Sequence, residues 1–387
     1  MSNGPPQPRT RAPGAGPGLV WRVTAHGLPG SSARLHAPQH GDLAGDQPLD
    51  DQTWLHLLAD VDLQRVPGFL MAAIEQGALP VTDAQRAQAR DRHLDSCRSV
   101  LGLERRLLEV VDVLESADIE VVVLKGSAHA HLLYEEPGLR HFGDVDVLVP
   151  SERIMDAVAV LERERGATRQ VPEVRPGFDR RFAKGVTLED PDGTELDIHR
   201  NLLFGTFGFQ IDTGELFRSS VPFEVGGREF RALGPEARLL HACYHAGLGD
   251  KRPRGNSMRD LGQMLAFEDH DPERVVALAQ RWRSLAVVSR AVAVARDYLD
   301  VEVEGPIGEA VRAHRLSRRE ARAIASYVGV RNTFGPKVRA SLPYCNSAGE
   351  AAGFLWASAV PSPAFLRRRA AGRADWLGRG LRRLRRR

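Results

Sequence analysis

The chain has 387 residues, of which 42% are hydrophobic and 27% are charged, as in ordinary globular proteins. Its three cysteines are too few for a disulfide scaffold and too far apart for a zinc finger, which excludes the secreted disulfide-rich class. No apolar run approaches the ~18 residues of a membrane-spanning helix. The amino terminus also lacks the layout of a secretion signal. We therefore expect a cytoplasmic protein with two or three structural units.

The formal net charge of +3 hides an asymmetry along the chain. Residues 367–387 hold ten Arg and one Asp, a local balance of +9, so the remainder carries −6. Trp376, Leu377, Leu381 and Leu384 recur in this tail at helical spacing. Such a basic amphipathic segment is typical of contact with an anionic membrane or a nucleic acid. The alternative is a helix that packs its apolar side chains onto the body of the protein.

The first 50 residues contain eight Gly and eight Pro. We expect them to be mostly disordered, because such a segment buries too little apolar surface to offset its ordering entropy. A short extended piece is expected around Val20–Val23. The pattern of the remaining chain predicts four regions: an N-terminal helical region at 51–117, a small mixed α/β core at 118–232, a C-terminal helical domain at 233–335, and a tail at 336–387 ending in the basic segment.

Apolar spacing and turn residues predict the elements of the core. In chain order these are a helix ending near Glu115–Ser116, a buried strand at Ile119–Leu124, a short helix at Ser127–Tyr134, a second strand at Asp144–Val149, a helix reaching about Arg165, a hairpin of Phe182–Glu189 with Thr194–His199, and a hairpin around Gly226 and Gly227. Helices follow at 235–248, 257–268, 272–283 and 285–299. The fold class is therefore α+β, with a small mixed sheet between helical flanks.

Two aspartates lie among the β-branched residues of the second strand, where Asp is disfavoured. On a strand, Asp144 and Asp146 point to the same face, with Cα atoms ~6.5–7 Å apart. Two such carboxylates repel each other unless a cation lies between them, and hard oxygen ligands favour Mg²⁺ or Mn²⁺. The alternative is a surface edge strand whose polar face is wet.

A third carboxylate lies on the hairpin strand, where Asp197 shares a face with Glu195 and His199. If this strand pairs beside the second strand, Asp197 completes a metal site. It then also accepts a proton from the hydroxyl or similar group that the metal activates. Otherwise it is an ordinary hairpin carboxylate. The hypothesis requires Asp197 to face the other two acids, with no cationic side chain bonded in the place of the metal.

A phosphate site is predicted where the first buried strand opens into a helix. Gly126 permits close approach to the backbone, Ser127 is expected to cap the helix, and Lys125 adds a positive charge. Arg140 is a second candidate phosphate ligand. The alternative for both cations is a solvated surface charge.

These residues together resemble the signature of the DNA polymerase beta-like nucleotidyltransferase superfamily. The stretch 119–200, with Gly126-Ser127, Asp144-Val145-Asp146 and Asp197, is similar to a large, mostly uncharacterised bacterial nucleotidyltransferase family. The resemblance implies a nucleotidyltransferase core at 118–232, with Asp144, Asp146 and Asp197 as catalytic metal ligands. It further implies Mg²⁺-dependent transfer of a nucleoside monophosphate from an NTP, such as ATP, to an unidentified acceptor, with release of pyrophosphate.

The remaining candidates are less specific. His241 and His245 lie four residues apart, a spacing that suits zinc, but they lack the intervening Glu of a metalloprotease motif. Helix packing, or a wall of the acceptor pocket, is the alternative for both. The cysteines show no partnered His or Asn, which argues against a thiol nucleophile. An alternative function is a non-catalytic module of this fold that engages RNA, a membrane or a partner protein through its basic tail.

Overall fold

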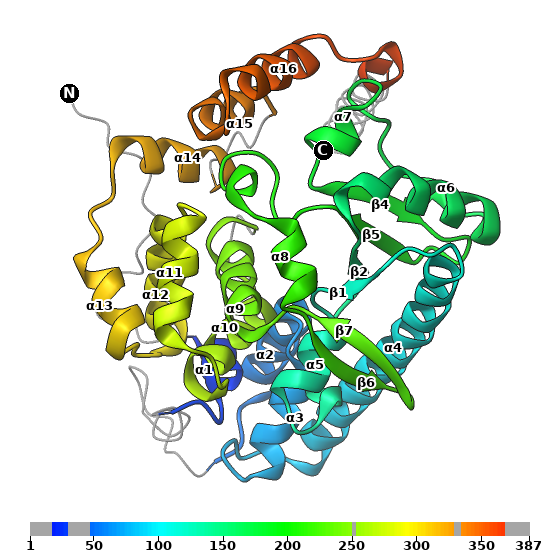
Figure 1. Cartoon of the computed structure of the whole chain (residues 1–387). Helices are drawn as coiled ribbons and strands as arrows, with labels where there is room; N and C mark the ends of the chain where they lie inside the picture. The colour runs from blue at the N-terminus through cyan, green and yellow to red at the C-terminus, as the bar shows by residue number, and fades with distance from the viewer. Residues whose placement is uncertain (1–17, 30–46, 250–252, 329–333, 368–387) are drawn as a thin grey trace, which may run out of the picture. The chain divides into compact units, whose positions relative to one another are not determined.

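A computed structural model describes residues 18–29, 47–249, 253–328 and 334–367 of the chain (Figure 1). These residues form two compact units. Unit 1 takes its described residues from 18–109, 122–146 and 214–328, and unit 2 takes them from 110–121, 147–213 and 334–367. The basic segment at the end of the chain lies outside the described residues, except for Arg367.

Unit 1 is mainly helical and contains one hairpin. Its elements are α1 (Leu19–Ala25), α2 (Asp51–Gln64), α3 (Pro67–Glu75), most of α4 (Asp83–Glu115), β1 (Val122–Val123), α5 (Ser127–Leu133), the 3-10 turn η1 (Pro137–Leu139), the start of β2 (Val145–Leu148), nearly all of α8 (Thr213–Arg218), β6 (Val221–Val225), β7 (Arg228–Ala232), α9 (Pro235–Tyr244), the π-helical turn η4 (His245–Gly249), α10 (Gly255–Phe267), α11 (Pro272–Arg281), α12 (Leu285–Leu299), α13 (Gly305–Ala313) and α14 (Arg318–Val328). Figure 1 shows α11 and α12 side by side, and the two helices are in contact.

Unit 2 combines a hairpin with helices from both of its chain segments. Its elements are the end of α4, the rest of β2, η2 (Ser151–Arg153), α6 (Ile154–Arg165), β3 (Thr168–Arg169), α7 (Phe178–Arg181), β4 (Gly185–Glu189), β5 (Glu195–His199), η3 (Gly208–Gln210), α15 (Phe334–Ser341), η5 (Leu342–Tyr344) and α16 (Ala348–Ala359). Helix α6 packs on β4 and β5. A cluster of phenylalanines, among them Phe178, Phe182 and Phe354, joins α7 to α16.

The seven strands form one mixed sheet in the order β3-β4-β5-β2-β1-β7-β6. In unit 1, β1 is parallel to β7, with Val123 opposite Ala232, and β7 is antiparallel to β6. In unit 2, β4 and β5 form the hairpin predicted around the turn at 190–193, with Thr187 opposite Asp197. This architecture confirms the α+β fold class.

Most element predictions hold to within a few residues. Asp144 lies just before β2, and the first hairpin strand begins at Gly185 rather than Phe182, because Phe182 is the C-cap of α7. Two differences are larger. The first strand is shorter than expected, since only Val122–Val123 has strand hydrogen bonding. All the apolar side chains between Ile119 and Leu124 are nevertheless buried. The expectation of an extended piece around Val20–Val23 is wrong, because these residues lie in helix α1. Val20 and Val23 are buried, and α1 packs on α2, α3, α10 and α12. Burial of one apolar face stabilises the helix here despite its Gly- and Pro-rich surroundings.

Within the described part of the chain, no helix has both the length and the apolar character needed to cross a bilayer.

Candidate functional site

Strand β2 is bonded on both sides, so it is not the wet edge strand considered above. Within unit 1, the N–H of Leu124 donates to the carbonyl of Asp146 at 3.1 Å. Within unit 2, the N–H of Val149, which continues β2, donates to the carbonyl of His199 at 2.9 Å. Residues three apart on a strand direct these groups to opposite sides. The Asp146 side chain is only 1% exposed, and Asp144 is half-buried.

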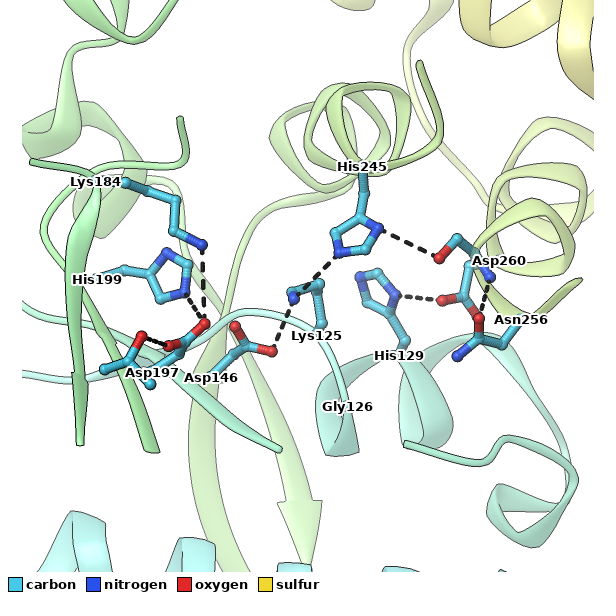
Figure 2. A network of polar contacts seen from close by, with 12 residues as sticks. Lys125, Gly126, His129, Asp146, Lys184, Asp197, His199, His245, Asn256 and Asp260 are labelled. Carbon is cyan, nitrogen blue, oxygen red and sulfur yellow. Dashed lines mark hydrogen bonds and ion pairs between the residues drawn. The ribbon is translucent and has the colours of Figure 1, made fainter. Parts of the chain in front are cut away.

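The ammonium group of Lys125 pairs with the buried carboxylate of Asp146. Its Nζ lies 2.8 Å from Asp146 Oδ2 and 3.4 Å from Nε2 of His245, which lies on η4 (Figure 2). The other ring nitrogen of His245 is 3.3 Å from Ser257 Oγ. A cationic side chain is therefore bonded to one of the three carboxylates, so a metal ion at Asp146 has to displace the Lys125 ammonium. The physical reason is the cost of leaving a buried carboxylate without a counterion.

The turn between β1 and α5 depends on glycine. Gly126 has φ +56° and is the N-cap of α5. A Cβ at this position would lie 3.2 Å from the Phe142 ring. Ser127 is the first helical residue and its side chain makes no capping hydrogen bond, so the expectation that it caps α5 is wrong. The turn instead places the buried Ser127 and the backbone of Gly126 directly after Lys125.

Arg140 is held in a buried network rather than in solvent. Its Nε donates to both oxygens of Asp260 at 2.9 and 3.0 Å, and its Nη2 donates to Oδ2 at 2.6 Å. Its Nη1 donates to the carbonyl of Gly126 at 3.4 Å. Asp260 also accepts from Tyr134 at 2.9 Å and lies 3.0 Å from His129 Nδ1. Arg140 therefore links helix α10 to the glycine turn.

Burial and charge act in opposite directions on the pKa values in this network. Burial opposes ionisation of Asp260, but the Arg140 guanidinium and His129 hold the pKa of its carboxyl well below the usual range. Burial likewise disfavours the charged form of Arg140. The carboxylate of Asp260 has the larger effect, so the pKa of Arg140 is raised. Burial lowers the pKa of His129 to about 4, against an opposing contribution from Asp260. The neutral His129 thus donates from Nδ1 to Asp260.

This pKa of His129 predicts an acid-sensitive fold. An unfolded histidine titrates near pH ~6.5. Between that value and about pH 4, the unfolded chain binds a proton that folded His129 does not, so stability falls as the pH falls, by at most ~1.4 kcal/mol per pH unit. We expect His129→Gln to reduce this slope in urea unfolding at pH 7, 6 and 5. His56→Gln, at an exposed position, should leave it unchanged, and an unaltered slope in His129→Gln would contradict the assignment.

Asp197 lies on β5 in unit 2 among three polar neighbours. Thr187 Oγ1, directly across the hairpin, donates to Asp197 Oδ1 at 2.5 Å. Lys184 Nζ and His199 Nε2 each lie 3.8 Å from Asp197 Oδ2 (Figure 2). The carboxylate is 17% exposed, whereas His199 is almost fully buried. One oxygen of Asp197 is thus oriented by a hydroxyl, and the other faces two cationic or potentially cationic groups.

The two histidines and the cysteine considered from the sequence pack within the helices of unit 1. His245 contacts Lys125 and Ser257, and His241 is buried in α9. Neither belongs to a group of side chains suited to holding a metal ion among the described residues. Burial raises the pKa of the Cys243 thiol to about 12, so this thiol stays protonated at neutral pH.

Comparison with known protein families identifies the chain over most of its described length. The model of an uncharacterised nucleotidyltransferase family matches residues 50–300. The chain belongs to this family. The matched stretch contains the glycine turn, all three candidate acids and the Arg140–Asp260 network, and it confirms the resemblance identified from the sequence. No curated protein matches the chain.

Solved structures with nucleotidyltransferase names are similar to parts of the chain. The antibiotic-resistance factor ANT(2'')-Ia has 18% identity and a TM-score of 0.33, covering 46% of this chain and 90% of its own. The lincosamide antibiotic adenylyltransferase LnuA, with lincomycin bound, has 17% identity and a TM-score of 0.30, covering 41% and 94%. An antigenic nucleotidyltransferase-like protein from Paracoccidioides brasiliensis has 16% identity and a TM-score of 0.30, covering 55% and 95%. Scores this low carry no argument about substrate.

Three residues of this family member that contact the candidate site were missed from the sequence. Thr187 was recoverable, since the turn at 190–193 sets the hairpin register that places it opposite Asp197. Lys184 precedes the same strand and carried no signal of its own. Asp260 lies 120 residues beyond Arg140, and no local pattern joins two residues so far apart.

Proposed function

We propose that the chain is a Mg²⁺-dependent nucleotidyltransferase that moves a nucleoside monophosphate from an NTP to an acceptor and releases pyrophosphate. The observation that carries this proposal is membership of the nucleotidyltransferase family over 50–300. That stretch contains the glycine turn and all three acids whose chemistry the reaction needs.

The acids have the composition of a divalent metal site. Asp144 and Asp146 of unit 1 and Asp197 of unit 2 supply carboxylate oxygens, and Glu195 and His199 flank Asp197 on β5. Asp146 is buried and already requires a positive charge, which Lys125 supplies at 2.8 Å. We propose Asp144, Asp146 and Asp197 as ligands of Mg²⁺ or Mn²⁺. When bound, these cations neutralise triphosphate charge and favour ionisation of the acceptor hydroxyl.

Lys125 then has a second partner available in the triphosphate. Its ammonium lies on a flexible four-carbon stem directly before the glycine turn. If Asp146 held a divalent cation, Lys125 would exchange this carboxylate for a phosphate oxygen at the turn, beside the backbone of Gly126 and Ser127. Arg140 serves the same site by bracing the carbonyl of Gly126, since its other donors face Asp260.

We assign to Asp197 the role of proton acceptor. Thr187 orients Oδ1, which leaves Oδ2 to receive the proton of the acceptor hydroxyl. A general base of this kind contributes ~10²–10⁴-fold to a reaction rate.

Nucleotide binding tests the first half of the proposal. We expect one or more NTPs with Mg²⁺ to raise the melting temperature of the chain, corresponding to ~2.7 kcal/mol at a free nucleotide concentration of 100 times Kd. Chelation of Mg²⁺ with EDTA should remove this stabilisation. No shift with any of the four NTPs would leave the proposal without support and favour a non-catalytic module.

Asp197→Asn tests the second half. Intact-mass measurement of candidate acceptors incubated with each NTP identifies the transferred nucleotide. We expect Asp197→Asn to keep most of the NTP-induced rise in melting temperature, because the phosphate site and two of the three proposed metal ligands, Asp144 and Asp146, lie in unit 1. The same change should lower transfer by at least ~10²-fold. Glu162→Gln, at an exposed position of the same unit, is the control. Full activity in Asp197→Asn would exclude the proton-acceptor role.

A further inference from the structure

Unit 2 contains a pocket of about 110 Å³ whose lining includes none of the residues given a role above. It lies where the chain leaves β5, between the loop that follows this strand and the first turn of α16. Its polar lining comes mainly from Ser151, Arg181, Arg200, Asn201, Thr213 and Glu350. About three to four water volumes fit this space, since one water occupies ~30 Å³ of liquid. The volume therefore suits one small ionic group.

Arg200 is fixed in this pocket and keeps a buried donor without a partner. Its Nη1 donates to the carbonyl of Ala183 at 2.9 Å, which holds the guanidinium in place. Its Nε is buried and has no hydrogen-bond partner. Burial lowers the pKa of Arg200, and only Glu350 opposes this effect. A buried guanidinium N–H without a partner is costly, which indicates that a ligand completes it.

Arg181 brings a second positive charge to the same pocket. Its guanidinium lies 5.2 Å from the ring centre of Phe182. Among the described residues, neither Arg181 nor Arg200 forms an ion pair with a carboxylate. Glu350 lies at the pocket, but its Oε2 accepts from the N–H of Asn346 at 2.6 Å, at the start of α16. The three side chains leave a local charge of +1, so the pocket attracts an anion.

The wall of the pocket is built in advance of a ligand. Asn201 donates from its side chain to the carbonyl of Gly208 at 3.0 Å and accepts from the N–H of Leu203 at 3.4 Å. A Cβ on Gly208 would lie 2.0 Å from the carbonyl oxygen of Leu203, so only glycine fits there. Ser151 Oγ donates to the carbonyl of Arg200 at 2.9 Å. These bonds hold the loop backbone around the arginine before binding.

We propose that this pocket binds the anionic group, a phosphate or a carboxylate, of the acceptor substrate, with Arg200 as its central ligand and Arg181 as its second. The chain position supports the link with the acceptor, because Arg200 follows Asp197 by three residues, ~10 Å along a strand. Assignment of the ligand to the acceptor rests on the proposed function. Anion binding at Arg200 does not.

Calorimetric titration of the full chain with inorganic phosphate and with acetate, at constant ionic strength, tests the pocket. We expect the wild type to bind at least one of the two, which also decides between the phosphate and carboxylate sources. Arg200→Gln should weaken that binding at least ~10-fold, because a charge-assisted hydrogen bond is lost. Arg180→Gln, on the exposed neighbour of Arg181 that does not line the pocket, should bind as the wild type does.

The remaining outcomes either overturn the anion-pocket proposal or separate it from the proposed function. Equal binding by the wild type and Arg200→Gln, or no binding of either anion by the wild type, overturns the proposal. If Arg200→Gln does not fold, Arg181→Gln at the exposed second ligand replaces it. We expect this variant to bind the anion at least ~3-fold more weakly, with an unchanged circular dichroism spectrum. Unchanged anion binding by Arg181→Gln would contradict the proposal. A chain that binds anions through Arg200 but transfers no nucleotide keeps the pocket and loses the proposed function. A chain that transfers nucleotide but does not bind anions through Arg200 keeps the proposed function and loses the pocket.

Discussion

Asp146→Asn is expected to lower nucleotidyl transfer by about a thousand-fold and to abolish most of the stabilisation by NTP with Mg²⁺. Metal-assisted charge stabilisation contributes several kcal/mol, and ~4 kcal/mol corresponds to this factor. The amide keeps the size of the carboxylate but loses the charge that Lys125 meets at 2.8 Å. Transfer rate and the NTP-induced rise in melting temperature are the two measurements.

Two controls separate this effect from a loss of folding. Asp91→Asn makes the same chemical change at an exposed position of α4 in unit 1 and should leave both measurements as in the wild type. Circular dichroism of Asp146→Asn without nucleotide should match the wild type, because the strand hydrogen bond of this residue is accepted by its backbone carbonyl, which the substitution keeps. Transfer within ten-fold of the wild-type rate would show that Asp146 is not a ligand of the catalytic metal.

Asp260→Asn is expected to cause the largest loss of stability, ~3–5 kcal/mol in the free energy of unfolding. Removing one partner of a buried ion pair leaves the other charge without compensation. Here the charge left behind is the guanidinium of Arg140, whose side chain is 6% exposed. Urea unfolding at pH 7 measures the loss. Asp269→Asn, at an exposed position of the same unit, should change the free energy by less than ~0.5 kcal/mol.

A double-mutant cycle checks that the cost belongs to the pair. Arg140→Gln combined with Asp260→Asn should be less destabilising than the sum of the single changes, with a coupling of ~1–3 kcal/mol. The pH gives a second check: the contribution of Asp260 is present above the pKa of an unfolded aspartate, near ~3.9, and is lost as the pH falls through its lower folded value. Additive effects in the cycle would show that Arg140 and Asp260 act separately.

The elements that carry the site follow from local patterns in the sequence. The β-branched run before Lys125, the glycine that follows it and the turn residues at 190–193 act over a few neighbours, so spacing and turn chemistry were enough to predict β1, α5, β4 and β5. The same local reasoning located the candidate acids, since alternation along a strand depends only on the backbone. It failed at Val20–Val23, where docking against other helices decides between extended chain and helix.

The sequence by itself determined the family, the α+β class and the residue types of the proposed metal and phosphate sites. Only the tertiary structure decided which charges meet: Lys125 bonds to Asp146, Arg140 bonds to Asp260, and Arg200 keeps a buried donor without a partner. The physical reason is that a buried charge takes as counterion whichever group the fold brings within a few ångströms. Arg140 and Asp260 lie 120 residues apart in the chain, so their approach depends on how distant segments pack together, and no short-range pattern encodes it.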